Sequence, residues 1–124
     1  MDIKKALEAF GQCYNNKSFF TISRLLRPEV SYDSYDCLYN ITSIDSVVKI
    51  LDESIKQNTE AYEGYYFWKS ILTRRLSKCV LICDSDTLKC IRIINIKIRK
   101  RKITRITGLN PREYEYTRGK KIAG

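Results

Sequence analysis

The chain contains no histidine, so any catalysis would have to rest on carboxylates, tyrosines, lysines or thiols. The missing imidazole excludes Ser-His-Asp and Cys-His nucleophilic systems, histidine-ligated metals and imidazole acid–base catalysis. Asp33 and Asp36 are the carboxylates closest in sequence to a group of aromatic residues. A carboxylate buried in an apolar pocket has a raised pKa and can act as a general base. The alternative interpretation is two turn aspartates between strands.

The aromatic residues gather in two stretches, residues 32–39 and residues 62–68. They are typical either of a tyrosine-rich core and rim or of a pocket for a flat apolar ligand, and the two overlap because the walls of a cavity are also core. The residues that we expect to line an apolar, tyrosine-rich pocket are Tyr14, Tyr32, Tyr35, Tyr66 and Trp68.

The five cysteines (Cys13, Cys37, Cys79, Cys83 and Cys90) form no CxxC pair. Cys79 and Cys83 lie in an expected strand, where four residues separate their Cα atoms by roughly 13 Å, too far for two ligands of one zinc ion. We expect reduced, buried cysteines and no structural metal. Glycine-rich phosphate loops and nucleotide-binding fingerprints do not occur in the sequence, so no cofactor is expected.

Positive charge is concentrated in the second half of the chain. Residues 69–105 contain twelve Lys or Arg against two Asp, a net charge of +10, whereas residues 1–68 carry a net charge of −3. The focus of this charge is Arg99, Lys100, Arg101 and Lys102. Such a cluster favours an anionic partner, namely nucleic acid, an acidic protein or an anionic lipid surface. The alternative is a solvated outer sheet face whose cations prevent edge pairing, and the lack of interleaved aromatic residues favours it.

Helical spacing of apolar residues predicts three helices before residue 60. The first covers residues 2–16, and its apolar stripe is Ile3, Ala6, Leu7, Phe10, Cys13 and Tyr14. A short second helix begins near Ser18 and is stopped by Pro28. The third begins after a cap at Thr42 or Ser43 and fades by Asn58.

Near Tyr62 the apolar period changes from 3.6 to 2, which predicts strands at residues 64–76, 79–83, 88–98 and 103–109, besides a short strand at 29–34. A hairpin turn at residues 84–87 would put Cys79, Leu81, Cys83, Leu88 and Cys90 on one face. The alternation slips between Ile93 and Ile94 and again between Ile103 and Ile106, which predicts a bulge or a bend. Helices followed by a run of strands indicate an α+β fold.

A chain of 124 residues, 44% apolar and 30% charged, is typical of one globular domain. We expect that domain over residues 1–117 and a frayed basic tail over residues 118–124. No apolar run approaches the roughly 20 residues that span a bilayer. The first residues lack the apolar region of a secretory signal, so a cytoplasmic protein is expected.

Three segments resemble the nuclear transport factor 2-like superfamily, which includes SnoaL-like cyclases and ketosteroid isomerases. They are NNKSFFTISRLLRPEVSYDS, ITSIDSVVKIL and INIKIRKRKITRITGLNPREY, at residues 15–34, 41–51 and 94–114. The resemblance implies a cone, in which three N-terminal helices pack in the concave face of a strongly bent, mostly antiparallel sheet. It also implies an apolar pocket at the wide end and a homodimer formed through the sheet.

The catalytic positions of isomerases in this group fall on different residues here. The position of their proton-abstracting carboxylate, at the end of the first strand, falls on Ser34, one residue from Asp33. Their oxyanion tyrosine falls at about Phe10, one turn before Tyr14. The resemblance therefore implies a cone domain that binds a small apolar molecule and has no assignable reaction. The alternatives are a cofactor-free isomerase, lyase or hydrolase that uses Asp33 or Asp36 with a tyrosine, and a module that binds protein or nucleic acid through residues 99–102.

Overall fold

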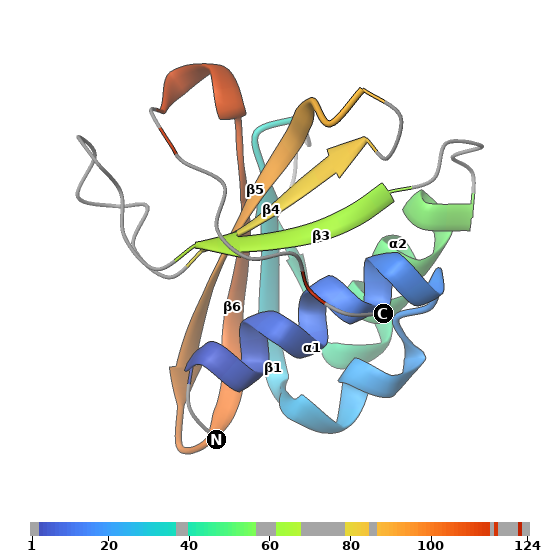
Figure 1. The fold of residues 1–124 in the computed structure, drawn as a ribbon. Coiled ribbons are helices and arrows are strands. Elements are labelled where there is room, and N and C mark those ends of the chain that lie inside the picture. Colours follow the sequence, from blue (N-terminus) through green and yellow to red (C-terminus); the bar gives the residue numbers. More distant parts are fainter. Residues whose placement is uncertain are drawn as a thin grey trace.

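The computed structural model describes residues 3–36, 40–56, 62–67, 79–84, 87–114, 116 and 122. Three helical segments precede most of the strands, as Figure 1 shows. The helical segments are α1 (Ile3–Asn16), the 3-10 helix η1 (Phe20–Leu25), α2 (Ile44–Lys56) and a late 3-10 turn, η3 (Pro111–Glu113). The strands are β1 (Leu26–Ser34), β2 (Ile41–Thr42), β3 (Tyr62–Phe67), β4 (Cys79–Asp84), β5 (Cys90–Arg99) and β6 (Lys102–Leu109).

The six described strands form one bent sheet in the order β2-β1-β6-β5-β4-β3. Strand β1 runs parallel to β6, and the other described neighbours are antiparallel. Helices α1, η1 and α2 pack inside the bend (Figure 1). The predicted α+β fold, with helices on the concave face of a mostly antiparallel sheet, is confirmed.

Two predicted elements differ from the observed ones. The second helix is a single 3-10 segment that ends at Leu25, before Pro28. Strand β1 therefore begins three residues earlier than expected and contains Pro28. Its pairing with β6 is irregular between Leu26 and Ser31, because proline has no N–H to donate to the ladder. Of the predicted strand at 64–76, residues 64–67 belong to β3, and residues 68–76 lie outside the described part.

Helix α1 turns its predicted apolar stripe toward the sheet, where Leu7, Phe10 and Tyr14 are buried. The rings of Phe10, Tyr14 and Phe19 lie 5.1–5.8 Å apart, so α1 is fixed against the start of η1. The buried carboxylate of Asp52 in α2 accepts a hydrogen bond from the Phe19 backbone N–H at 3.1 Å. This bond ties the third predicted helix to the second.

Ile122, a described residue of the C-terminal segment, lies in the core. Ile122 is buried, and its carbonyl accepts a hydrogen bond of 2.9 Å from the Asn15 side chain of α1. Its side chain lies against Gly11, where an added Cβ would come within 2.3 Å of Ile122 Cδ1. This residue of the expected frayed tail thus packs on α1. The predicted domain boundary at residue 117 falls outside the described residues and stays a prediction.

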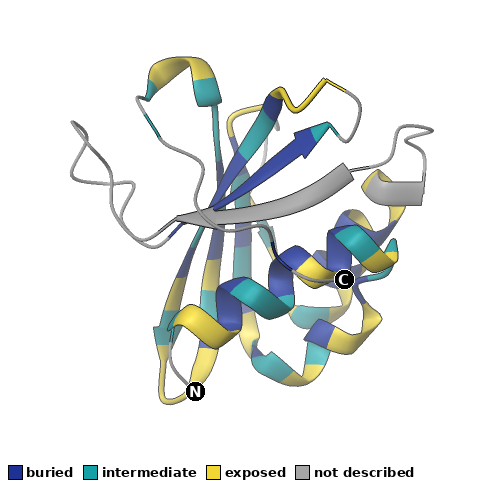
Figure 2. Ribbon diagram, in the orientation of Figure 1, coloured by how far each residue is buried: buried dark blue, intermediate teal, exposed yellow. Residues whose placement is uncertain are grey.

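Strand β4 and the neighbouring part of β5 are buried on both faces of the sheet. Val80, Ile82 and Ile94 pack against the helices on the concave face. A second cluster covers the opposite face: Cys79, Leu81, Cys83, Cys90 and Ile93, with Leu109, Tyr114 and Tyr116 against it. Strand β4 is accordingly buried along almost its whole length (Figure 2). The cysteines predicted to share one face do so.

The two predicted slips in alternation have different causes. Ile93 and Ile94 are both buried because they point to opposite, equally covered faces. The register shift near them is two residues earlier, where Ile91 is the extra residue between the pairs Ile82↔Arg92 and Cys83↔Cys90. Between Ile103 and Ile106 the predicted bulge is confirmed. There the pairing shifts between Lys97 and Ile98, which leaves Thr104 as the extra residue.

The described cysteines, Cys13, Cys79, Cys83 and Cys90, are buried. Cys37 lies outside the described residues. Within the described part of the chain, no helix has the length and apolar character to cross a membrane.

The second apolar cluster gives a stability prediction. Leu81→Ala is expected to lower the free energy of unfolding by about 2–5 kcal/mol, because it leaves a cavity in a fully buried face. The matched change Leu88→Ala is expected to cost under about 0.5 kcal/mol, because Leu88 is 42% exposed. Urea unfolding followed by circular dichroism measures both. Similar losses for the two variants would contradict a second core on this face.

Candidate functional site in the concave face

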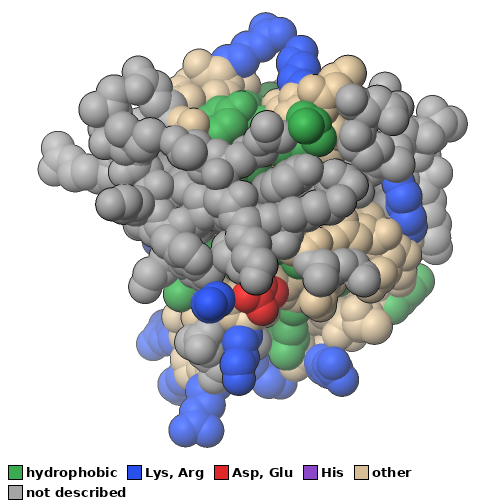
Figure 3. All heavy atoms as spheres, in the orientation of Figure 1, with side chains coloured by type: hydrophobic (Ala, Val, Ile, Leu, Met, Phe, Trp, Pro, Cys, Tyr) green, Lys and Arg blue, Asp and Glu red, His purple; other side chains and the backbone are tan. Residues whose placement is uncertain are grey.

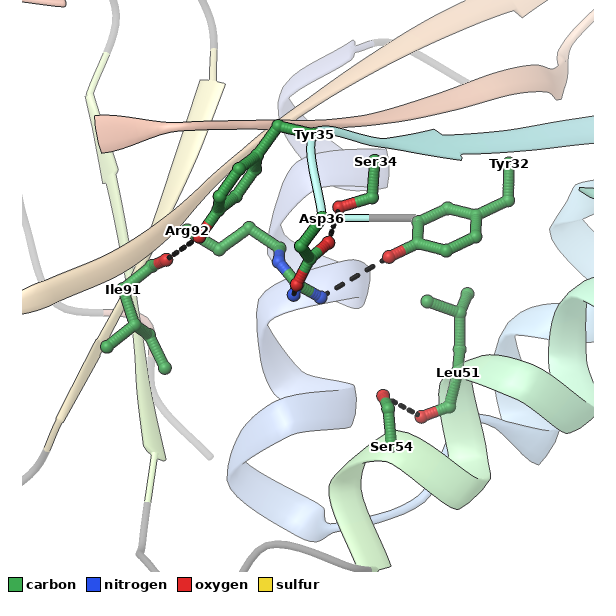
Figure 4. A network of polar contacts seen from close by, with 8 residues as sticks. All are labelled: Tyr32, Ser34, Tyr35, Asp36, Leu51, Ser54, Ile91 and Arg92. Carbon is green, nitrogen blue, oxygen red and sulfur yellow. Dashed lines mark hydrogen bonds and ion pairs between the residues drawn. The ribbon is translucent and has the colours of Figure 1, made fainter. Parts of the chain in front are cut away.

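A charged side chain, Arg92 of β5, lies on the concave face among apolar neighbours. It pairs in register with the buried Ile82 of β4, and its side chain is 20% exposed. The guanidinium donates from Nη1 to Tyr32 Oη at 3.3 Å and from Nη2 to Asp36 Oδ2 at 2.5 Å (Figure 4). Strand β1 supplies Tyr32, and Asp36 follows its end. We call Arg92, Tyr32, Ser34, Asp36 and Tyr14 the inner polar cluster.

The bulge at Ile91 is what directs Arg92 inward. Cys90 faces the outer apolar cluster, and strict alternation would place residue 92 on that same face. The extra residue reverses the alternation, so that Arg92 shares the concave face with Ile94 and Ile96. The local bend in β5 therefore creates the charged part of the site.

Asp36 is held as a carboxylate. Ser34 Oγ donates a hydrogen bond to Asp36 Oδ1, and Arg92 forms an ion pair with the other oxygen. Burial raises the pKa of Asp36, but the Ser34 hydrogen bond and the Arg92 charge outweigh it and hold this pKa below its usual value. An aspartate in this state orients a cation well and is a weak base.

Gly108 of β6 leaves room for the side chains of Ser34 and Arg92 to lie close together. Its position lies between β1 and β5, paired with Ser34 on one side and with Ile94 on the other. A Cβ at this residue would come within 2.7 Å of Ser34 Oγ and 3.2 Å of Arg92 Cδ. Only a residue without a side chain lets Ser34 and Arg92 approach each other across β6.

Tyr14 of α1 brings a buried hydroxyl to the same region. The residue is 4% exposed, and neither Tyr14 Oη nor Arg92 Nε has a hydrogen-bond partner among the described residues. Burial raises the pKa of Tyr14 although the charge and the N–H donors of the nearby Arg92 oppose the rise, so the phenol stays protonated and its O–H can donate. Burial by itself lowers the pKa of Arg92. The neighbouring Tyr14, Tyr32 and Asp36 outweigh this effect and hold the pKa above its usual value. Both groups are therefore buried donors at neutral pH.

Tyr35 connects the cluster to the surface. It is 49% exposed, donates from its hydroxyl to the Ile91 carbonyl at 3.2 Å, and holds its ring 6.0 Å from Arg92 Cζ. A hollow of about 330 Å³ lies beside it, in the size range of small-ligand sites. This hollow is lined by Tyr35, Lys89, Cys90, Ile91, Asn110, Pro111 and Arg112.

A second hollow of about 430 Å³ lies between η1 and α2, away from the cluster. Apolar side chains, including Phe20, Ile44 and Val48, share its lining with Asp45 and Glu53.

The structure brings together Tyr14, Tyr32, Tyr35 and Asp36 of the predicted site residues. Asp33 lies elsewhere: it alternates with the buried Tyr32 and Ser34 along β1 and so occupies the opposite face, beside Thr107. A catalytic role for Asp33 stays a prediction.

The remaining predicted residues are far from the cluster or not described. Tyr66 lies in β3, where only the backbone is described, and Trp68 lies outside the described residues. The predicted anion-binding residues 99–102 lie at the opposite end of β5 from Arg92, in the turn to β6.

Thiol and metal chemistry find no support in the described part of the chain. Burial raises the pKa of Cys13 and of Cys79 to about 11, so both are protonated, weakly nucleophilic thiols at neutral pH. No group of three or more Cys, Asp or Glu in that part of the chain is placed to hold a metal ion.

The ion pair gives a pH-dependent prediction. Asp36→Asn is expected to lower the free energy of unfolding at pH 7 by about 1–2 kcal/mol, because Arg92 loses its counter-charge while partly exposed. Asp36 has a lowered pKa in the folded protein, so its contribution is present above the ordinary aspartate value of about 3.9 and is lost as the pH falls through the lowered pKa. The difference between parent and variant should therefore shrink below about pH 4.

Chemical unfolding at a series of pH values measures this difference. Asp33→Asn, on the other face of β1, is the matched control and should change stability at pH 7 by less than about 0.5 kcal/mol. A stability difference for Asp36→Asn that is the same at pH 3 and pH 7 would contradict the assigned ion pair.

No protein-family model matches this chain, and no curated protein matches its sequence. Solved structures do match it. A putative ketosteroid isomerase from Kribbella flavida DSM 17836 is 12% identical with a TM-score of 0.61, over 94% of this chain and 83% of that one. An NTF-2 like protein of unknown function from Burkholderia xenovorans LB400 is 15% identical with a TM-score of 0.61, over 88% and 84%.

A third match, an epoxide hydrolase of the LEH-like type from M. tuberculosis, is 14% identical with a TM-score of 0.58, over 91% of this chain and 85% of that one. At these identities the likeness concerns the arrangement of helices and strands. It agrees with the resemblance of the three sequence segments and with the bent sheet around α1, η1 and α2. The chain therefore has the NTF2-like cone fold.

Proposed function

We propose that this domain binds a small organic molecule inside its cone, with an acceptor oxygen of the ligand against Tyr14 and Arg92. The observation that carries the proposal is the pair of buried donors, Tyr14 Oη and Arg92 Nε, without a hydrogen-bond partner among the described residues. Leaving a buried donor unpaired costs about 1–3 kcal/mol, so such groups need an explanation. A ligand that supplies the acceptor is the simplest one.

The surroundings of these donors define the class of ligand. Tyr14 contacts the rings of Phe10 and Phe19, so one side of the site is apolar and aromatic. The Arg92 guanidinium can only donate, and the neutral Tyr14 phenol presents an O–H donor. The ligand should thus combine an apolar body with a carbonyl, carboxylate or sulfonate oxygen. Two proteins of the same fold are named as a putative ketosteroid isomerase and an LEH-like epoxide hydrolase, and both names support the use of the cone for small organic molecules.

A cofactor-free isomerase, lyase or hydrolase is the second candidate. The observation in its favour is that Asp36 lies in the same cluster as the hydroxyl of Tyr32, through Arg92. Against it, the lowered pKa makes Asp36 a weaker base than an aspartate in an apolar pocket. Binding is therefore the function that we favour. The homodimer and the cytoplasmic location stay predictions.

Removing only the Tyr14 hydroxyl tests the proposal. Tyr14→Phe should leave the free energy of unfolding unchanged or raise it by up to about 1 kcal/mol, because an unpaired buried hydroxyl is lost. The same variant should bind anilinonaphthalene sulfonate, a flat aromatic anion, about tenfold more weakly, a loss of about 1.4 kcal/mol. Fluorescence titration and urea unfolding of the same samples measure the two effects.

Tyr32→Phe is the control for a purely structural tyrosine. It removes a hydroxyl that is hydrogen-bonded to Arg92, so stability should fall by about 1 kcal/mol. Equal dye affinity for the parent and Tyr14→Phe, or no dye binding by the parent, would contradict the proposal.

A further inference from the structure

The hairpin of β5 and β6 places like charges directly opposite each other. Lys97 pairs in register with Arg105, and Arg99 pairs with Lys102. All four side chains are exposed and lie on the outer face, because the alternating Ile96 and Ile106 face the helices. Like charges in cross-strand pairs destabilise a sheet. The ribbon thus carries two unfavourable pairs in succession.

The turn of this hairpin adds a second unfavourable feature. Lys100 has φ 50° and Arg101 has φ 65°, so both central residues are in the left-handed region. Two-residue hairpin turns of this kind favour Asn-Gly, because a residue with a Cβ pays roughly 1–2 kcal/mol there. Two cations occupy the turn instead.

Little acidic charge balances these groups locally. Glu29 of β1 lies near enough for the charge of Arg99 to act on it, but it already forms an ion pair of 2.5 Å with Arg27. The hydrogen bond from Arg27 and, to a smaller extent, the charge of Arg99 lower the pKa of Glu29. In Figure 3, Lys and Arg side chains gather at the lower end of the molecule, where Figure 1 places the β5–β6 turn and the start of α1.

We propose that this cationic ribbon, comprising Lys97, Arg99, Lys100, Arg101, Lys102 and Arg105, binds the sugar–phosphate backbone of nucleic acid without regard to sequence. A polyanion with one charge per roughly 1.7 Å of duplex relieves the repulsion within the ribbon, since each phosphate neutralises a cation. A two-stranded ribbon also has the width that a duplex groove admits. Local conflicts of this kind are expected where a surface serves binding.

An anionic membrane fits the ribbon less well. Surface binding to lipid combines basic residues with apolar side chains that enter the bilayer. The large exposed apolar residues in the described part of the chain are Phe20, Tyr35, Ile50 and Leu88, and none lies on the ribbon. The inference is independent of the ligand site, because the ribbon lies at the other end of β5 from Arg92.

Removal of one like-charged pair tests the proposal on the full chain. Fluorescence anisotropy with short random-sequence duplex DNA should show binding at about 50 mM salt, with a slope of log affinity against log salt near −5. Lys97→Gln with Arg105→Gln should weaken binding at least tenfold and reduce the magnitude of the slope by about 2. The same variant should melt at a higher temperature than the parent, because the cross-strand repulsion is gone.

Arg24→Gln with Lys49→Gln is the charge-matched control, since both residues are exposed and lie on η1 and α2. It should change affinity by less than twofold. A second variant is available if Lys97→Gln with Arg105→Gln fails to fold. Lys100→Asn with Arg101→Gly removes two ribbon charges and places residues in the turn that favour its backbone conformation. This variant should fold and bind DNA more weakly than the parent. No DNA binding at low salt, equal losses in the control, or tighter binding to phosphatidylserine vesicles than to DNA would overturn the proposal.

Discussion

One extra residue in β5 places a charged side chain on the concave face of the sheet. Because Ile91 bulges between the pairs Cys83↔Cys90 and Ile82↔Arg92, the strand reverses its alternation and sends a guanidinium toward the helices. A cation in that position must be compensated, since burial of an unpaired charge is costly. Tyr32 of β1, two strands away, and Asp36, which follows the end of β1, supply the compensation. The neighbouring strand can accommodate this contact only because position 108 is glycine.

Strand β4 and the first part of β5 are stabilised by apolar contacts on both faces of the sheet. On the outer face, Cys79, Leu81 and Ile93 form a cluster independent of the helices. On the inner face, α1, η1 and α2 pack mainly around Phe10, Phe19 and Leu51. This apolar burial on two sides stabilises β4 and β5, so that β5 tolerates a charged residue at position 92.

Strand β5 joins two chemically different ends of the molecule. Its first half carries Arg92, whose charge is balanced by Asp36 and shielded by the ring of Tyr35. Its second half carries Lys97 and Arg99, whose charges face further cations on β6. The positive charge of Arg92 is therefore neutralised inside the molecule, whereas the positive charges of Lys97 and Arg99 are exposed to solvent. This contrast is why we assign a small ligand to one end and a polyanion to the other.

The sequence by itself determined most of the helices and strands and which of their residues share a face, because apolar periodicity follows burial. It placed Leu7, Phe10 and Tyr14 on one helical face, Cys79 and Leu81 on one strand face, and a bulge before Ile106. It also marked residues 99–102 as the focus of charge. Strict alternation from Cys90, however, puts Arg92 outside, and only the tertiary pairing of β4 with β5 reveals the bulge that turns it inward.

The partners of Arg92 could likewise not be found from sequence spacing. Asp36 is 56 positions away from Arg92, and Gly108 shows its role only when β6 lies between β1 and β5. Asp33 and Asp36 look equivalent in the sequence, yet one faces the outer side of β1 and the other ends in the inner polar cluster. Local patterns fix which residues are buried, whereas contacts between distant strands decide which charges meet.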